Sequence, residues 1–270
     1  MLLFKKINFL PLICFISISL SYAAASKVEI SKILSRIRQA LKTLNLEIIA
    51  HQEGYTQLPR TEKIIRVAPK LVRFVSDSKG RWRYESEDFQ SIYDGKYWWK
   101  LEKSKCVFSK QIVSPERANF TRQTYLKGIL SAYLIPIFTY DEKDPKQKAF
   151  WDFGNATLQE TTIDRKKSLL LTIPSFKEAF KLFSSETKRL ISTSTFVFKI
   201  WIDPKTYLPL QIQTDEKQNK SENPEWQGAV TKWFCKIVKF SLNPHIKKDT
   251  FKFSPPKGAR EINPSEIGLP

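Results

Sequence analysis

Residue types that carry out chemistry are present in this chain, but their spacing fits no common catalytic pattern. The 270 residues contain no G-x-S-x-G elbow, no H-E-x-x-H pair, no P-loop and no dinucleotide-binding glycine pattern. Glu85, Glu87 and Asp88 form an acidic cluster that resembles a catalytic carboxylate pair, although a solvated strand end is the simpler interpretation. The sequence therefore predicts a protein with no catalytic residues, no cofactor and no enzymatic activity.

Cysteine and histidine are too sparse and too scattered for a metal site. Long stretches of chain separate His51, His245, Cys106 and Cys235, so no zinc-ligand spacing occurs among them. Cys14 lies inside an apolar run without the small-residue box that precedes a lipid-modified cysteine. Two alternatives stay open for Cys106 and Cys235: a disulfide, which an oxidising compartment would preserve, or two separate buried thiols.

The N-terminus has the parts of a secretory signal peptide. A basic start is followed by an apolar run over residues 9–20 and by the small residues Ala23–Ala25. The apolar run is shorter than the roughly 20 residues that a membrane-spanning helix needs. Residues 1–25 are therefore predicted to be a cleaved leader, and residues 26–270 to form a single exported domain.

The chain is strongly basic, with 45 Lys and Arg, 27 Asp and Glu, and a formal net charge of +18. The predicted leader holds two of the lysines, so the mature chain carries 43 minus 27, or +16. This excess favours anionic partners, and since export argues against nucleic acid, an anionic membrane surface or an acidic protein patch is expected. A solvated basic surface without a specific partner is the simplest interpretation, because the charges are spread along the chain.

Hydrophobic periodicity predicts one amphipathic helix followed by a meander of antiparallel strands. Apolar residues recur at three- and four-residue spacing over residues 26–44. After Asn45, short β-branched and aromatic runs alternate with turn residues. Ser114 is a suitable N-cap for a later helix. We expect further helices at residues 115–140 and 176–190, and further strands at residues 156–162, 168–173, 195–202, 208–213 and 230–240.

Aromatic residues of the meander fall on defined faces. Alternation along one predicted strand places Trp82 and Tyr84 on the same dry face. The Asp-Gly pair at residues 94–95 predicts a tight hairpin whose two central residues both have positive φ. Trp98 and Trp99 follow this hairpin and must point in opposite directions. At least one of them therefore lines an inner cavity or is covered by another element.

Three motifs resemble the bacterial outer-membrane lipoprotein carrier family and its lipoprotein-sorting relatives. Residues 91–99 (SIYDGKYWW) look like the family's S-x-DGK-x-x-W hairpin, and residues 203–210 (DPKTYLPL) are similar to its D-P-x-T-x-x-P hairpin. Residues 251–259 (FKFSPPKGA) look like its F-x-F-x-P-P-x-G ending. An Ala-Pro-Lys turn at residues 68–70 also fits the family's pattern. Their order and spacing extend the resemblance over nearly all of the chain after the leader.

This resemblance implies an α+β fold, namely a half-open antiparallel β-barrel wrapped around a hydrophobic cavity and covered by helices. It also implies a periplasmic carrier that binds the acyl chains of lipoproteins or lipids during transport towards the outer membrane. An inner-membrane complex and an outer-membrane acceptor are the further partners that the family suggests. On this interpretation the following side chains line the cavity or its covering helix: Trp82, Tyr84, Trp99, Phe196, Phe198, Leu210, Leu134 and Ile135.

Two other interpretations remain open. Each of these aromatic and aliphatic residues is also an ordinary core residue and can fill an interior without a cavity. The family's wider circle includes periplasmic sensor and regulatory proteins of the same fold that bind an anti-sigma factor. A regulatory interaction protein is therefore the alternative to a carrier.

Overall fold

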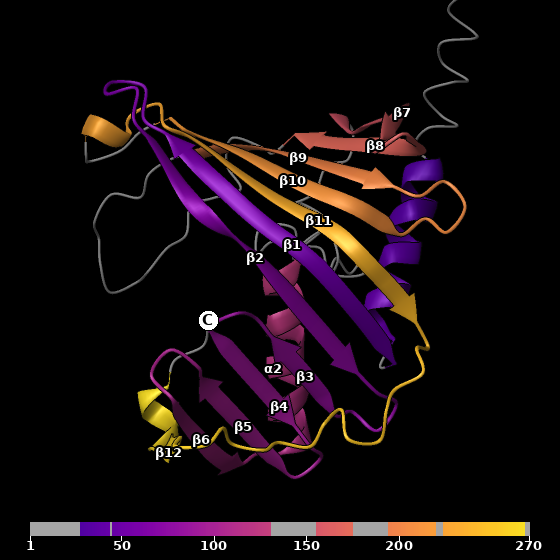
Figure 1. Cartoon of the computed structure of the whole chain (residues 1–270). Coiled ribbons are helices and arrows are strands. Elements are labelled where there is room, and N and C mark those ends of the chain that lie inside the picture. The colour runs from indigo at the N-terminus through magenta and orange to yellow at the C-terminus, as the bar shows by residue number, and fades with distance from the viewer. Residues whose placement is uncertain (1–27, 44, 131–154, 175–193, 220–223, 268–270) are drawn as a thin grey trace, which may run out of the picture.

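One curled, twelve-stranded sheet dominates the computed structural model, which describes residues 28–43, 45–130, 155–174, 194–219 and 224–267 (Figure 1). The strand order is β12-β6-β5-β4-β3-β2-β1-β11-β10-β9-β8-β7, and all neighbours are antiparallel except β12 and β6. The strands are β1 (Leu46–Gln57), β2 (Ile64–Ser76), β3 (Trp82–Glu85), β4 (Phe89–Tyr93), β5 (Tyr97–Glu102), β6 (Val107–Ile112), β7 (Thr157–Ile163), β8 (Lys166–Pro174), β9 (Ser194–Ile202), β10 (Pro209–Gln218), β11 (Val230–Leu242) and β12 (Arg260–Glu261).

The sheet divides at β2 into two parts that differ in orientation (Figure 1). β2 pairs with β1 along nearly its whole length but with β3 only at Arg73–Ser76. We call β7 to β11, β1 and residues 64–72 of β2 the upper sheet, and the remaining strands with the end of β2 the lower sheet. The expected α+β class and antiparallel sheet are confirmed. Among the described residues the sheet stays open, with β12 and β7 as its two edges.

Two α-helices occur in the described ranges, at residues 28–42 and at α2 (Pro115–Ile129). We call the side of the sheet that α2 packs against the inner face. The predicted amphipathic stripe of the first helix is confirmed, because Ile33 and Ile37 are fully buried in the main core. The predicted N-cap is also confirmed, since the Ser114 side chain accepts a hydrogen bond from the backbone N–H of Arg117.

Aromatic side chains fill the space between α2 and the lower sheet. Trp82 is fully buried, and its indole N–H donates a 3.1 Å hydrogen bond to the carbonyl of Ala118 on α2. The rings of Tyr84 and Tyr125 stack at a centroid distance of 4.6 Å. The predicted pairing of Trp82 and Tyr84 on one dry face is thereby confirmed, and α2 covers that face.

The outer face of the lower sheet is covered as well, by the C-terminal segment (residues 243–259). Phe251 is buried in a second, smaller core with Val75 and Ile92. Phe253 stacks on Trp99 at a centroid distance of 4.8 Å and an interplanar angle of 18°. Trp98 and Trp99 do point in opposite directions, and the covering element expected for one of them is this segment.

Two local predictions are wrong. Residues 68–70 lie inside β2 rather than in a turn, at a β-bulge where Gln52 pairs with Lys70 and Gly54 with Val67. Pro69 is tolerated because β2 has a strand neighbour on only one side there. In the β4–β5 hairpin only Gly95 has positive φ, because the Asp94 carboxylate accepts the N–H groups of residues 96 and 97 and shapes the loop.

Several predicted features lie outside the described residues. These are the leader at residues 1–25, the part of the 115–140 helix after residue 130, the helix at residues 176–190, and both residues expected on the covering helix, Leu134 and Ile135.

Candidate functional site

The inner face of the upper sheet continues beyond the end of α2. Gln52 on β1 marks this boundary, because its side-chain amide donates to the carbonyls of Gly128 and Ile129 at 2.9 and 2.8 Å. These bonds satisfy carbonyls in the last turn of α2. Side chains alternate along a strand, so Gly54 and Thr56 share the face of Gln52.

The same face continues from β1 onto five other strands: β2, β11, β10, β9 and β8. Its residues form two rows that run across the strands. Directly paired residues of antiparallel strands lie on the same face, so each row follows from the pairing. We call the two rows together the distal inner face. The first row is Val67, Gly54, Trp233, Thr214, Phe198 and Ile173, and the second is Ile65, Thr56, Thr231, Glu216 and Phe196.

Gly54 shapes the middle of the distal inner face. A Cβ atom at this position would lie 2.6 Å from Cε3 of Trp233 and 2.9 Å from the carbonyl oxygen of Lys232. Only glycine therefore lets the Trp233 ring lie across the backbone of β1. A glycine in a strand interior weakens the strand, and it commonly marks such a close approach.

Exposure changes along the distal inner face from one end to the other. On β9, Phe196 and Phe198 are 4% and 0% exposed, and their rings stack at 6.3 Å. On β2, Ile65 and Val67 are 39% and 40% exposed. The distal inner face thus runs from a closed aromatic end to an apolar end that solvent reaches.

The polar residues of the distal inner face are three threonines and one glutamate: Thr56, Thr214, Thr231 and Glu216. The hydroxyls of Thr56 and Thr231 hydrogen-bond each other at 2.9 Å, so they offer little to a polar ligand. Glu216 is the single charged member of the two rows and is half-buried. Such a surface can bind hydrocarbon by burial and can direct only weak polar recognition.

Four of the predicted cavity residues, Trp82, Tyr84, Phe196 and Phe198, belong to one buried core cluster. Within it, Phe196 and Phe198 lie on the distal inner face, whereas Trp82 and Tyr84 lie five strand positions away under α2. Trp99 is on the outer face under the C-terminal segment, so the structure does not place it with the others.

Leu210 is half-buried at a β-bulge and is outside the main core cluster. Leu134 and Ile135 lie outside the described residues. Sequence reasoning missed Ile65, Val67 and Trp233. The one available signal was a glycine at position 54 within an otherwise β-forming run.

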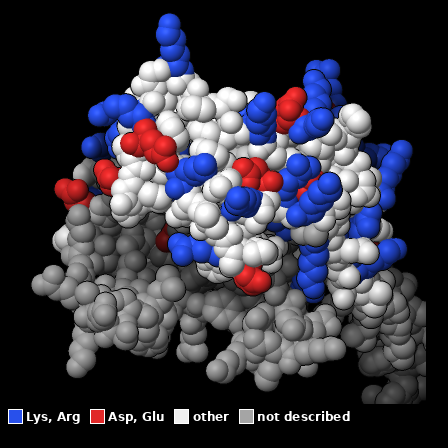
Figure 2. All heavy atoms as spheres, turned by 90° about the horizontal axis from the view of Figure 1, so that it is seen from below, with Lys and Arg blue, Asp and Glu red and all other residues white. Residues whose placement is uncertain are grey.

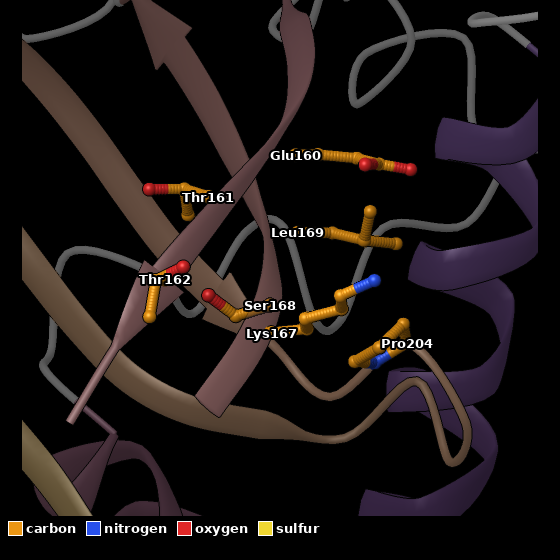
Figure 3. Close-up of a pocket in the computed structure, with 7 residues that line it drawn as sticks. All are labelled: Glu160, Thr161, Thr162, Lys167, Ser168, Leu169 and Pro204. Atoms are coloured by element: carbon orange, nitrogen blue, oxygen red, sulfur yellow. The ribbon is translucent and has the colours of Figure 1, made fainter. Parts of the chain in front are cut away.

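A separate polar pocket of about 310 Å³ lies between β7, β8 and the β9–β10 loop (Figure 3). Glu160, Lys167 and Leu169 point to one side of the two strands, towards Pro204, and Ser168 points to the other. The polar side chains therefore do not converge on one point, as a specific polar ligand would require.

The two thiols are free and stand in different surroundings. Cys106 is partly exposed in the turn after β5, whereas Cys235 is buried on the inner face of β11. The Cys235 thiol donates to the carbonyl of Ile129 at 3.0 Å, and burial raises its pKa to about 12. Cys235 is therefore an unreactive core residue. The two thiols are separate, as one of the two alternatives had it, but only Cys235 is buried.

Several charged groups on the strands form salt bridges. Burial raises the pKa of Glu85, but Arg83 at 2.9 Å and Lys103 at 3.5 Å outweigh this and hold the pKa below its usual value. Glu85 is thus an ionised structural group, as expected for a strand end. Seen from below, Lys and Arg side chains are numerous and lie among acidic and uncharged ones (Figure 2).

Two further observations bear on the kind of site present. The described residues include no group of three or more His, Cys, Asp and Glu side chains placed to hold a metal ion. Within the same ranges, no helix is both long and apolar enough to cross a membrane.

Comparison with known proteins gives one family match. The model of a family described as "Predicted periplasmic protein (DUF2092)" matches residues 43–263, well over half of the chain. No curated protein matches.

Three of the solved structures that match are distantly similar to this chain. An uncharacterized conserved protein from Thermus thermophilus is 11% identical, with a TM-score of 0.35 over 87% of this chain and 98% of that chain. LprF from Mycobacterium bovis is 9% identical, with a TM-score of 0.39 over 82% and 98%. A DUF1329 family protein from Desulfovibrio piger is 10% identical, with a TM-score of 0.28 over 82% and 95%. These TM-scores are too low to establish a common fold.

Proposed function

This chain belongs to the DUF2092 family of predicted periplasmic proteins, and from that premise we propose that it is a non-enzymatic periplasmic carrier of acyl chains. It would bind the hydrocarbon of a lipid or a lipoprotein on the distal inner face and move it towards the outer membrane. The motif resemblance to lipoprotein carriers supports the cargo class. A leader at residues 1–25 and one domain over residues 26–270 belong to the same proposal.

The observation that carries the proposal is the exposure of Ile65 and Val67 on the inner face. Two neighbouring apolar side chains that are each about two-fifths exposed leave area for a ligand to cover. Burial of hydrocarbon contributes about 25 cal/mol per Å², so an acyl chain lying from β2 towards Phe198 would gain several kcal/mol without directional bonds. In this proposal the curled sheet acts as the half-open barrel, and the distal inner face is its binding surface.

The direct test is to purify the protein from an envelope fraction, extract it with organic solvent and identify bound lipid by mass spectrometry. We expect stoichiometric lipid, and displacement of a fluorescent fatty-acid probe by added fatty acid. Absence of lipid together with absence of probe uptake would overturn the carrier. Specific capture of one membrane protein by the lipid-free chain would then favour the regulatory alternative.

β2 itself supplies a matched control for the binding surface. Ile65 and Val67 point to the inner face, whereas Ile64 and Leu71 are similarly exposed on the outer face of the same strand. Charge on the inner face opposes hydrocarbon burial. We therefore expect Ile65→Glu/Val67→Glu to weaken probe binding about tenfold or more. The Ile64→Glu/Leu71→Glu variant should leave binding within about twofold, and equal losses in both variants would refute the assignment of the surface.

A further inference from the structure

The first half of β2 is an edge strand, although β2 lies in the middle of the strand order. β3 stops at Glu85, which pairs with Arg73, so residues 64–71 have β1 on one side and no strand of the described part of the chain on the other (Figure 1). All eight of these residues are exposed. We call residues 64–71 the β2 edge. Unpaired backbone N–H and C=O groups of such an edge are a template for another strand.

Charge on the β2 edge is of one sign. Arg66 points to the outer face and Lys70 to the inner face, and β2 contains no acidic residue. Neither side chain forms a salt bridge to another described residue, whereas Arg73 beyond the edge is paired with Glu47. Two copies of this chain paired through their β2 edges would bring these cations together, which is destabilising. Basic residues, the bulge and Pro69 are typical protections of an edge against self-association.

A strand with acidic side chains would be attracted by these cations and would not be repelled. We propose that the β2 edge is a docking site where an extended, acidic segment of a partner protein adds as an extra strand of the sheet. Backbone hydrogen bonds to β2 would provide affinity, as in other strand-addition complexes. Alternate side chains of the segment would contact Ile65 and Val67 on one face and Ile64 and Leu71 on the other. Carboxylates of the segment would pair with Arg66 and Lys70.

Pro69 limits the length of this contact. It supplies no backbone N–H, and the bulge at residues 68–69 displaces the β2 backbone from a regular register. Regular pairing therefore extends mainly over residues 64–67, with the Lys70 side chain available to a carboxylate beyond the bulge. A contact of this size is typical of a transient complex, and it exchanges readily.

The test uses the full chain and a synthetic eight-residue peptide of repeating Glu-Glu-Val-Val with blocked ends, which places carboxylates and apolar side chains on both faces of an extended strand. We expect binding that fades with added salt and that slows amide hydrogen exchange at residues 64–67. The same peptide with N-methyl groups on alternate residues of one edge should bind at least tenfold more weakly, because it lacks the N–H donors for β2. A peptide with Lys in place of Glu should not bind measurably.

Charge-reversed variants separate a specific site from general attraction to a basic protein. Arg66→Glu/Lys70→Glu should weaken binding of the acidic peptide by tenfold or more. Lys252→Glu/Lys257→Glu changes the net charge equally at two exposed residues of the C-terminal segment and should change the affinity less than twofold. Equal effects of the two variants, or exchange protection away from the β2 edge, would overturn the proposal. Concentration-dependent dimers with protection of the same residues would overturn it in favour of self-pairing.

This proposal is separable from the carrier function. Arg66→Glu/Lys70→Glu leaves Ile65, Val67 and Trp233 in place, so fatty-acid probe uptake should be retained. Loss of peptide binding with retained probe uptake would show that strand addition depends on Arg66 and Lys70 and that hydrocarbon binding does not, although both ligands contact Ile65 and Val67. Loss of both would indicate damage to β2 itself, which circular dichroism and a urea titration would show.

Discussion

The lower sheet and the distal part of the upper sheet are built from the same kinds of residues but are covered differently. In the lower sheet, α2 packs on one face and the C-terminal segment on the other, so that Trp82 is fully buried and Trp99 is stacked on Phe253. On the distal inner face, apolar residues of β2 remain about two-fifths exposed. The lower sheet is covered on both faces, so its apolar side chains form a core. The distal inner face is open at β2, so its apolar side chains there form a surface that a ligand can cover.

Strand length explains the difference. β2 and β1 have 13 and 12 residues, whereas β3 has four. β3 ends at Glu85, which pairs with Arg73, and α2 ends near Gln52, so the longer strands extend past both coverings. Stability is therefore expected to concentrate in the lower sheet and binding in the upper sheet, and each of the following measurements tests that separation.

The largest expected effect is on the stability of the core between α2 and the lower sheet. Trp82→Ala removes a fully buried indole and its hydrogen bond to Ala118, and we expect a loss of about 3–5 kcal/mol in the free energy of unfolding, measured by urea titration. Trp233→Ala removes the same ring from a half-buried site and should cost less than half as much. Equal losses would show that the two regions do not differ in the way proposed.

A smaller effect is expected where β1 passes beneath Trp233. Gly54→Ala places a methyl group 2.6 Å from the Trp233 ring, so the ring must move, and overpacking should cost about 1–3 kcal/mol. Tryptophan fluorescence and fatty-acid probe binding should both change. The control is Gly128→Ala on α2, where a Cβ meets nothing within 4 Å, and a gain of about 0.5–1 kcal/mol is expected there.

Removal of Phe253 should cost about 1–2 kcal/mol, because its ring is only half-buried but stacks on Trp99. Protection of β5 amides against hydrogen exchange should fall, while probe binding on the distal inner face should stay unchanged. A change in probe binding would mean that the outer covering of the lower sheet and the distal inner face are coupled.

The smallest effect concerns acid stability. Burial raises the pKa of Glu47, but hydrogen bonds from Lys239 and Arg73 outweigh it and the pKa is lowered from its usual 4.5. A lowered folded-state pKa gives stability that is present above pH 4.5 and lost as the pH falls through the folded-state pKa. Both cations are about half exposed, so the contribution is about 1 kcal/mol or less. Glu47→Gln should flatten this acid slope of the unfolding free energy, and an unchanged slope would assign it to other carboxylates.

Local pattern was enough to predict some of these elements. The helical stripe and the shared face of Trp82 and Tyr84 depend on spacing within one element, and spacing is visible in a sequence. The covering of Trp99 was not predictable, because Phe253 lies 154 positions further along (253 minus 99). The exposure of Val67 depends on where β3 ends. The residues near Val67 in the sequence give no information on the end of β3. For the same reason the residues of the distal inner face were only partly identified.

The pairing of β1 with β11 has a consequence for how the protein folds. Leu46 pairs with Leu242, so the central strand partners are 196 positions apart (242 minus 46), and the C-terminal segment then returns to the lower sheet. Contacts this distant fold slowly, because a long loop must close before they form. A chain delivered N-terminus first would hold β1 without its neighbour β11 until residues 230–242 arrive. During that interval the central strands are exposed to misfolding and proteolysis, which makes timely completion of the C-terminus a condition of their survival.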